Sequence, residues 1–503
     1  MKEIHSKILT IYRFSLTNNS PFHQMDEIEK QLPIKPHQDD LSLLLLEKSL
    51  QNSDSNNGTN SEDLDDFDQT EFNYYIQTIN EIFASGNVNQ ISSVFEVVYN
   101  IMNQHKDDDP SISDFDETII KNVFENMMKY FDSNCGDLLQ IILKFLLHFS
   151  EFVSELGLFL AQTGYLIPIY NFFTTQNLPA EIASDFLRFM SNIIMSSPLT
   201  RDQLVENGLL NYFFIVFNNC INDRVIIECL LNCIYNFFKY NSFEKVNEMN
   251  EFTNLLEFLP NLIIKLFSIP EIYDLAFISY LSNDYIIQSL YIYVNDDKAL
   301  PSDTNENIGI LLDLEIPQKL FRLLQSELPY EFKKTIDFLV TDIIKRTFLY
   351  AESSLLPEFS ATIDVSILLN FFDLEKLHVC ENILCIIEYI ICNQPATVNL
   401  LNSLNFYGNM MNIVDNLPYS LKKCIIGDIV ASIIVTTSTE IIQLFSNEEI
   451  VELLSDYINQ GQLPCSEKIP EALEKINSIL AEDDYISAKI REILESCEYR
   501  ECI

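Results

Sequence analysis

Residues 191–210, SNIIMSSPLTRDQLVENGLL, contain the pattern that decides the fold. The stretch begins with the end of an apolar helical run, breaks at Pro198, and continues as a short helix that closes on Gly208. A second apolar run starts directly after that glycine. Such a pattern defines an architecture only where it recurs along the chain.

The pattern does recur. LAQTGYL (160–166) matches LVENGLL (204–210) at an offset of 44 residues. Further along, IICNQPATVNLLNSLN (390–405) aligns without a gap with IIMSSPLTRDQLVENG (193–208), at an offset of 197. A unit of about 40 residues cannot bury its apolar faces alone, so neighbouring units must stack on one another.

The whole chain after Glu71 has helical spacing. Apolar residues fall at i, i+3, i+4 and i+7 almost everywhere, as in VIIECLLNCIYNFF (225–238). Glycine is scarce, at ten residues, and alternating strand patterns bounded by turn residues are hard to find. The sequence therefore predicts an all-α protein built as a helical-repeat solenoid.

The repeating unit resembles the armadillo repeat, which has a Gly between its first and second helices and an Asn on its third. The resemblance is good over residues 135–245 and fair over 380–440. It implies a right-handed solenoid. The middle, 250–375, lacks the Gly marker, so the solenoid is expected to be irregular there, and HEAT-like helix pairs fit that region equally well.

Three segments are expected along the chain. Residues 1–70 form an N-terminal tail, with a short helix at 39–50 (DDLSLLLLEKSL) and an acidic linker at 51–70 that is too polar to fold. Residues 71–480 form the armadillo-like repeats. Residues 481–503 have helical spacing and more charge, which is typical of a capping helix.

The charge balance limits the class of partner. The 503 residues include 31 Lys and Arg against 74 Asp and Glu, a formal net charge of −43. This sign opposes nucleic acids and anionic membranes as partners and favours basic proteins or peptides. The alternative is that the acidity only keeps a chain with 48% hydrophobic residues soluble.

The cysteines predict the compartment. There are eleven, an odd number, and they lie mostly in apolar helical runs, where a thiol packs as a small hydrophobe. The N-terminal residues lack the pattern of a secretory signal, and the longest apolar runs are too short to span a membrane. The cytoplasm is therefore the expected location, with the nucleus as a second compartment.

The sequence offers no motif for catalysis. GxGxxG, GxxxxGK, HExxH, GxSxG and CxxC are all missing, and no two of the six His have the spacing of metal ligands. Cys220, Cys229 and Cys233 could hold a metal, but packing within a helix layer explains them more simply. We expect no enzymatic activity, no cofactor and no metal.

The resemblance also implies a binding site. In armadillo proteins the third helices line a groove, and their Asn side chains hold the backbone of an extended peptide, because an amide both donates and accepts. Carried over by position, these residues are Asn192 and Asn236, with His148 at the same place one unit earlier. Arg188 and Asn232 lie one turn before the two asparagines and are the other expected contacts.

The expected function is a non-enzymatic scaffold or adaptor whose solenoid groove binds a basic protein or extended peptide. The alternative is a regulatory subunit or cofactor of another enzyme, such as a phosphatase subunit, an exchange factor or a chaperone cofactor. The nuclear-import adaptors of the armadillo family carry a Trp one turn before each Asn, whereas this chain has no Trp.

Overall fold

The structure is a computed structural model. It describes residues 69–85, 91–104, 110–131, 136–176, 178–240, 243, 246–295, 301–373, 376–406, 421–436, 439–459, 468–481 and 484–501. The helix expected at 39–50 and almost all of the acidic linker expected at 51–70 lie outside these residues. The helices below all belong to one compact unit of the chain.

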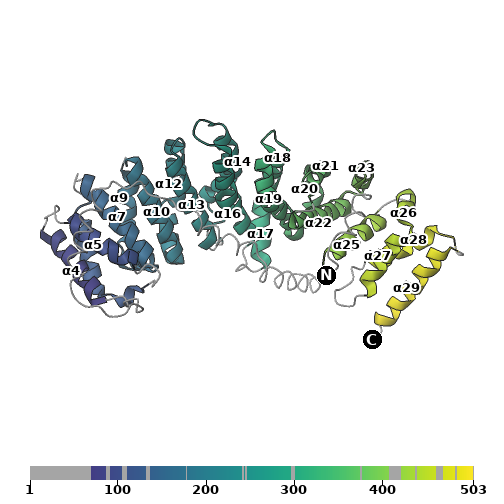
Figure 1. Cartoon of the computed structure of the whole chain (residues 1–503), viewed down its shortest axis with the longest axis horizontal. Coiled ribbons are helices and arrows are strands. Elements are labelled where there is room, and N and C mark those ends of the chain that lie inside the picture. The colour runs from purple at the N-terminus through teal and green to yellow at the C-terminus, as the bar shows by residue number, and fades with distance from the viewer. Residues whose placement is uncertain are drawn as a thin grey trace, which may run out of the picture. The chain divides into compact units, whose positions relative to one another are not determined.

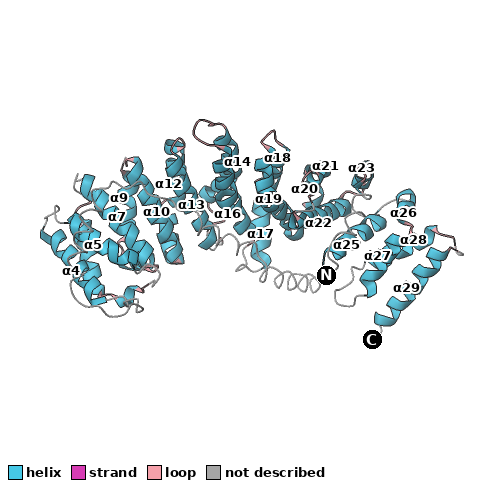
Figure 2. Cartoon of the chain, in the orientation of Figure 1, coloured by secondary structure: helices cyan, strands magenta, loops and turns pink. Residues whose placement is uncertain are grey.

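The described part of the chain is all-α, as the sequence predicts. Figure 2 shows helices joined by loops, and no strand occurs within the described ranges. The fold class is therefore confirmed.

The stretch that suggested the repeat forms the expected elements. Helix α10 (Ala180–Ser196) ends at Ser197, and α11 (Pro198–Glu206) begins with Pro198 in its first turn. The Ser197 hydroxyl caps α11 by accepting a hydrogen bond from the Thr200 N–H at 3.1 Å. The break therefore has a local cause in the capping serine and the proline that follows it.

Two consecutive units contain three helices each. The first has α8 (Leu156–Thr163), α9 (Leu166–Thr175) and α10, and the second has α11, α12 (Leu209–Cys220) and α13 (Arg224–Tyr240). The first two helices of each unit are separated by a glycine in the left-handed region, Gly164 at φ 80° and Gly208 at φ 91°. The repeated Gly is thus a repeated turn that other residues adopt with difficulty.

The N-terminal side of these units has the same kind of packing. Helices α4 (Gln69–Ser85) and α5 (Ile91–Gln104) precede the short η3 (Ile112–Asp114), α6 (Glu117–Met128) and α7 (Gly136–Phe152). Helix α4 packs on both α5 and α6, and α5 packs on α7.

The middle of the chain combines both expected patterns. Helix α14 (Asn250–Phe267) is followed by α15 (Leu275–Tyr280), the π-helix η4 (Leu281–Ile287) and α16 (Gln288–Val294), which continue one another, so this unit is a helix pair. The next unit returns to three helices, α17 (Pro301–Asp313), α18 (Ile316–Gln325) and α19 (Tyr330–Tyr350). Glu315 replaces the missing glycine between α17 and α18, with φ 55°.

The last units repeat the pattern with variations. Helices α20 (Leu356–Thr362) and α21 (Val365–Leu369) precede α22 (Leu377–Asn393), and α23 (Thr397–Ser403) precedes α25 (Leu421–Thr436). Asn405, which aligns with Gly208, also has a positive φ, 51°. Helices α26 (Thr439–Phe445), α27 (Glu448–Asn459), α28 (Lys468–Ile479) and α29 (Tyr485–Glu501) follow.

The final helix of each unit packs against the final helix of the next. The contacts run α7 to α10, α10 to α13, α13 to α16, α16 to α19, α19 to α22, α22 to α25 and α25 to α28 (Figure 1). We call these eight helices the long-helix row. Apolar side chains are buried beneath it throughout, from Phe149 on α7 to Ile476 on α28.

The left-handed turns predict opposite effects of two substitutions. Gly208→Ala should lower the free energy of unfolding by about 1–2 kcal/mol, because an alanine is strained at φ 91° even though no atom lies within 4 Å of the added Cβ. Glu315→Gly should raise it by about 1 kcal/mol, because it relieves the same strain and removes only an exposed ion pair with Arg322. Urea denaturation followed by circular dichroism measures both.

Gly309 is the matched control, since it lies inside α17 without a positive φ and with no atom within 4 Å of an added Cβ. Gly309→Ala should stabilise the protein by about 0.5–1 kcal/mol. Destabilisation of similar size at Gly309 and Gly208 would contradict the assignment of the turn.

Candidate functional site

The predicted asparagines join neighbouring members of the long-helix row. The Asn192 amide on α10 donates to the Ser150 hydroxyl on α7 at 3.1 Å. One unit later, the Asn236 amide on α13 donates to the Ser191 hydroxyl on α10 at 2.7 Å. Asn232 donates to the same hydroxyl at 3.1 Å. We call these bonds the amide–hydroxyl contacts.

The same contact returns further along the row. On α22, the Asn382 amide donates to the Thr341 hydroxyl of α19 at 3.3 Å, and both residues are buried. In each case an asparagine binds a hydroxyl on the preceding long helix. The asparagines therefore help to hold consecutive units together.

This geometry limits what the asparagines can offer to a peptide. Asn236 is only 7% exposed, whereas Asn192 and Asn232 are half-buried. One amide hydrogen of each is already donated to a serine. Peptide binding by Asn192 and Asn232 remains a prediction, and it would use the amide groups that the serines leave available.

The other two predicted residues belong to a small charged group. His148 on α7 lies 3.3 Å from the Glu151 carboxylate, and its ring centroid is 4.1 Å from that of Tyr99. Burial raises the pKa of Asp185, while the charges of Arg188, Lys144 and His148 lower it less strongly. The five predicted residues therefore lie on α7, α10 and α13, which are three consecutive members of the long-helix row.

Arg188 is an exposed member of this group. Burial of part of its side chain lowers the pKa of the guanidinium, but contact with the Cys229 thiol and the charges of Asp185 and Glu151 raise it further, so the net shift is upward. Groups on α10 and on its row neighbours α7 and α13 therefore stabilise the positive charge of the Arg188 guanidinium.

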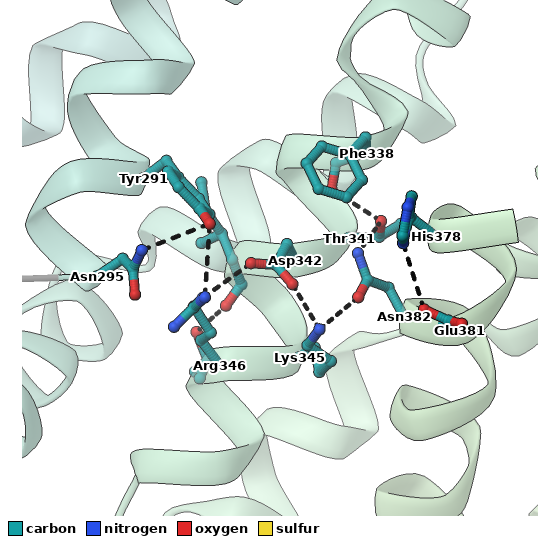
Figure 3. A network of polar contacts seen from close by, with 12 residues as sticks. Tyr291, Asn295, Phe338, Thr341, Asp342, Lys345, Arg346, His378, Glu381 and Asn382 are labelled. Carbon is teal, nitrogen blue, oxygen red and sulfur yellow. Dashed lines mark hydrogen bonds and ion pairs between the residues drawn. The ribbon is translucent and has the colours of Figure 1, made fainter. Parts of the chain in front are cut away.

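A larger polar network lies further along the row, between α16, α19 and α22 (Figure 3). The buried Asp342 carboxylate binds Lys345 at 2.6 Å and Arg346 at 2.8 Å. Lys345 also donates to the Asn382 carbonyl oxygen at 2.5 Å, and Arg346 donates to the Tyr291 hydroxyl at 3.4 Å. Two cations on α19 thus connect one buried carboxylate to both neighbouring helices.

Two aspartates on α19 have opposite electrostatic environments. Burial alone would raise the pKa of Asp342, but Lys345 and Arg346 together hold it below its ordinary value. Asp337, one and a half turns earlier, is also buried and binds Lys376 at 2.8 Å. Burial is the stronger effect there and raises the pKa of Asp337.

Sequence reasoning found Asn192, Asn232 and Asn236 but missed Asn382 and the hydroxyl partners of all four. Ser150, Ser191 and Thr341 carry no signal in a single sequence, because small hydroxyl residues are common in helices. Asp342 did carry one, since Lys345 and Arg346 follow it at the i+3 and i+4 spacing of helical ion pairs.

No group of three or more His, Cys, Asp or Glu side chains in the described residues is arranged to hold a metal ion. None of the described helices alone has the length and apolar composition to cross a membrane, although α8 and α9, bent by 97°, meet these criteria as a pair.

The amide–hydroxyl contacts predict coupled effects on stability. Asn236→Ala and Ser191→Ala should each lower the free energy of unfolding by about 1–2 kcal/mol, because a buried hydrogen bond is lost. The double variant should fall short of the sum by about 0.5–1.5 kcal/mol. Asn211→Ala, at an exposed asparagine of α12, is the control and should change stability by less than about 0.5 kcal/mol. Strict additivity would contradict the contact.

The two aspartates predict opposite pH dependences. Asp342→Asn should cost roughly 3 kcal/mol at neutral pH, because it leaves two cations without their buried partner. Since the folded pKa of Asp342 is lowered, this difference from the wild type should shrink as the pH falls below about 4.

Asp337→Asn is the matched comparison on the same helix. Because the folded pKa of Asp337 is raised, the wild type should lose stability relative to this variant as the pH rises above about 4. Urea denaturation of the three proteins between acid and neutral pH measures both differences. The same direction of change for the two variants would contradict the assigned environments.

Comparisons with known proteins bear on the fold. No protein-family model and no curated protein matches the sequence. Among solved structures, an engineered protein superposes with a TM-score of 0.50 at 12% identity, over 82% of this chain and 97% of that chain. At that identity the likeness concerns the fold alone.

Two further matches have lower scores. A designed armadillo repeat protein has a TM-score of 0.39 at 15% identity, over 53% of this chain and 99% of its own. A chain from work on a phosphorylation switch that controls the interaction between cadherin and β-catenin has a TM-score of 0.42 at 10% identity, over 86% and 93%. The repeated three-helix units themselves give the chain an armadillo-like helical-repeat fold.

Proposed function

We propose that the protein is a non-enzymatic scaffold that binds a basic protein segment on the exposed side of the long-helix row. This proposal rests on one observation, the side-by-side packing of consecutive helices in the long-helix row. Because consecutive long helices pack side by side, they present His148, Arg188 and Asn232 on three successive helices. An extended segment crossing the helices could contact one unit after another.

The charge of the chain supports a basic partner. A net charge of −43 attracts cationic segments over long distances and raises the rate of encounter. The exposed side of the row also carries three cations of the chain, Lys144, Arg188 and Lys239. A basic segment must therefore match the charges along its path on the row as well as the net charge of the chain. Binding of this kind weakens with added salt.

The experiment uses the full chain as bait for a displayed library of peptides, followed by measurement of the affinity of the selected peptides. We expect enrichment of basic sequences whose affinity falls as the salt concentration rises. Asn192→Ala combined with Asn232→Ala should weaken binding by about 5-fold or more, the effect of losing about 1 kcal/mol of hydrogen bonding.

The control for this variant is Asn211→Ala combined with Asn218→Ala, which removes two exposed asparagines from α12, outside the long-helix row. It should leave affinity unchanged. Equal losses in the two double variants, or selection of peptides without basic residues, would contradict the proposal. An enzyme that contains a selected sequence, and whose turnover changes when it binds the chain, would favour a regulatory subunit.

A further inference from the structure

One junction of the long-helix row contains a group of tyrosines and carboxylates. Tyr235 and Glu228 come from α13, Tyr280 ends α15, and Asp284 and Tyr285 belong to η4. We call these five residues the tyrosine–carboxylate cluster. Tyr280 is 36% exposed and the other four side chains are half-buried, so the cluster reaches the surface.

The π-helix creates this arrangement. In an α-helix of about 3.6 residues per turn, residues five apart point in different directions. The wider turn of a π-helix, with its i to i+5 hydrogen bonds, brings such residues onto one side. The hydroxyls of Tyr280 and Tyr285 consequently lie 2.5 Å apart, and Tyr280 also donates to Glu228 at 3.3 Å. π-Turns within helices occur often at functional sites.

The tyrosine rings of the cluster lie at steep angles to one another, so the cluster offers a ligand ring faces as well as ring edges. The Tyr280 and Tyr285 ring centroids are 5.3 Å apart at 73°, and those of Tyr235 and Tyr285 are 6.1 Å apart at 69°. Both carboxylates act on the phenols, since the charges of Glu228 and Asp284 help to raise the pKa of Tyr280 and of Tyr285, for which burial is the main cause. Aromatic faces beside carboxylates attract a cation.

Elsewhere in the row, carboxylates that connect neighbouring helices have a cation of the chain as partner. Asp337 pairs with Lys376 at 2.8 Å and Glu388 with Lys468 at 2.9 Å. Asp342 pairs at 2.6 Å with Lys345 of its own helix, which in turn binds Asn382 on α22. Within the described ranges, by contrast, no Lys or Arg forms an ion pair with Glu228. Among the described residues, Glu228 therefore lacks the cation that Asp337 and Glu388 have.

Two cations of α13 show how arginine and lysine side chains lie against aromatic rings near the cluster. The Arg224 guanidinium lies 3.6 Å from the centroid of Phe277, in contact with the ring face, whereas the Lys239 ammonium stays 5.6 Å from the centroid of Tyr235. A planar guanidinium can stack on an aromatic ring and bind a carboxylate with two parallel hydrogen bonds. Of the two basic side chains, arginine fits the cluster better.

We propose that the tyrosine–carboxylate cluster binds an arginine side chain of the protein partner. The guanidinium stacks against Tyr280 and Tyr285 and pairs with Glu228, as a lysine of the chain itself pairs with Asp337 and with Glu388. This site rests on the proposed function, and it identifies one residue type that the basic partner must carry. Lys239 marks the edge of the site and repels the incoming charge.

The test uses a fluorescent Gly-Ser peptide that carries spaced arginines, and the same peptide with citrulline, the neutral analogue, at each arginine position. Fluorescence anisotropy at about 50 mM salt gives the affinity for the full chain. We expect arginine to bind at least 10-fold more tightly than citrulline. Glu228→Gln and Tyr285→Leu should each weaken arginine binding by about 5-fold or more.

Three variants serve as controls. Glu257→Gln removes one negative charge from α14, where Glu257 pairs with Lys319, and should change affinity by less than 2-fold. Tyr280→Phe keeps the ring and should retain most of the binding, whereas Lys239→Ala should leave it equal or tighter. Circular dichroism melting of every variant shows whether the fold is intact, and Tyr280→Leu replaces Tyr285→Leu where the latter unfolds.

Equal weakening by Glu228→Gln and Glu257→Gln, or equal binding of the arginine and citrulline peptides, would overturn the arginine site. The scaffold proposal fails separately. If the combined Asn192→Ala and Asn232→Ala variant loses its selected peptides while Glu228→Gln keeps them, the long-helix row binds the partner but this cluster does not. If only the Glu228→Gln variant loses the selected peptides, the arginine site is supported and the partner does not bind at the asparagines.

Discussion

The rest of the structure depends on the packing of each long helix against the next one in the row. This contact buries apolar side chains that a single unit would leave in water, so no unit is stable without its neighbours. Apolar packing alone does not fix how far one helix slides along another. The amide–hydroxyl contacts do so, because a hydrogen bond such as that from Asn236 to Ser191 at 2.7 Å tolerates only small displacements.

The left-handed turn between the first two helices is the second constraint, and it explains how much of the fold could be read from the sequence. Gly164 and Gly208 revealed the repeat because only glycine adopts this conformation without strain. In the middle of the chain Glu315 adopts the same turn at φ 55°, so the geometry persists although the marker is lost. The repeat was therefore predictable where a glycine forms the turn without strain. It was not predictable where another residue forms the same turn in a strained conformation.

The candidate site was less predictable, for a physical reason. Position in the repeat placed Asn192, Asn232 and Asn236 on the row, but whether an amide faces a peptide or a neighbouring helix depends on a serine about 40 residues away. The π-helix left no signal at all. A change from 3.6 residues per turn to a wider turn over residues 281–287 moves Tyr285 next to Tyr280, and nothing in the local composition requires it.

These contacts suggest how a repeat protein can separate stability from recognition along one surface. A polar group that is satisfied by the adjacent unit, as Asp342 is by Lys345 and Arg346, costs free energy to redirect toward a partner. A group without such a cation, as Glu228 is among the described residues, can bind a charge from outside without breaking an internal ion pair. The junctions differ in how completely their polar groups are paired. Under the proposal of an arginine site, specificity arises from incomplete pairing at particular junctions, while the complete junctions hold the row that positions them.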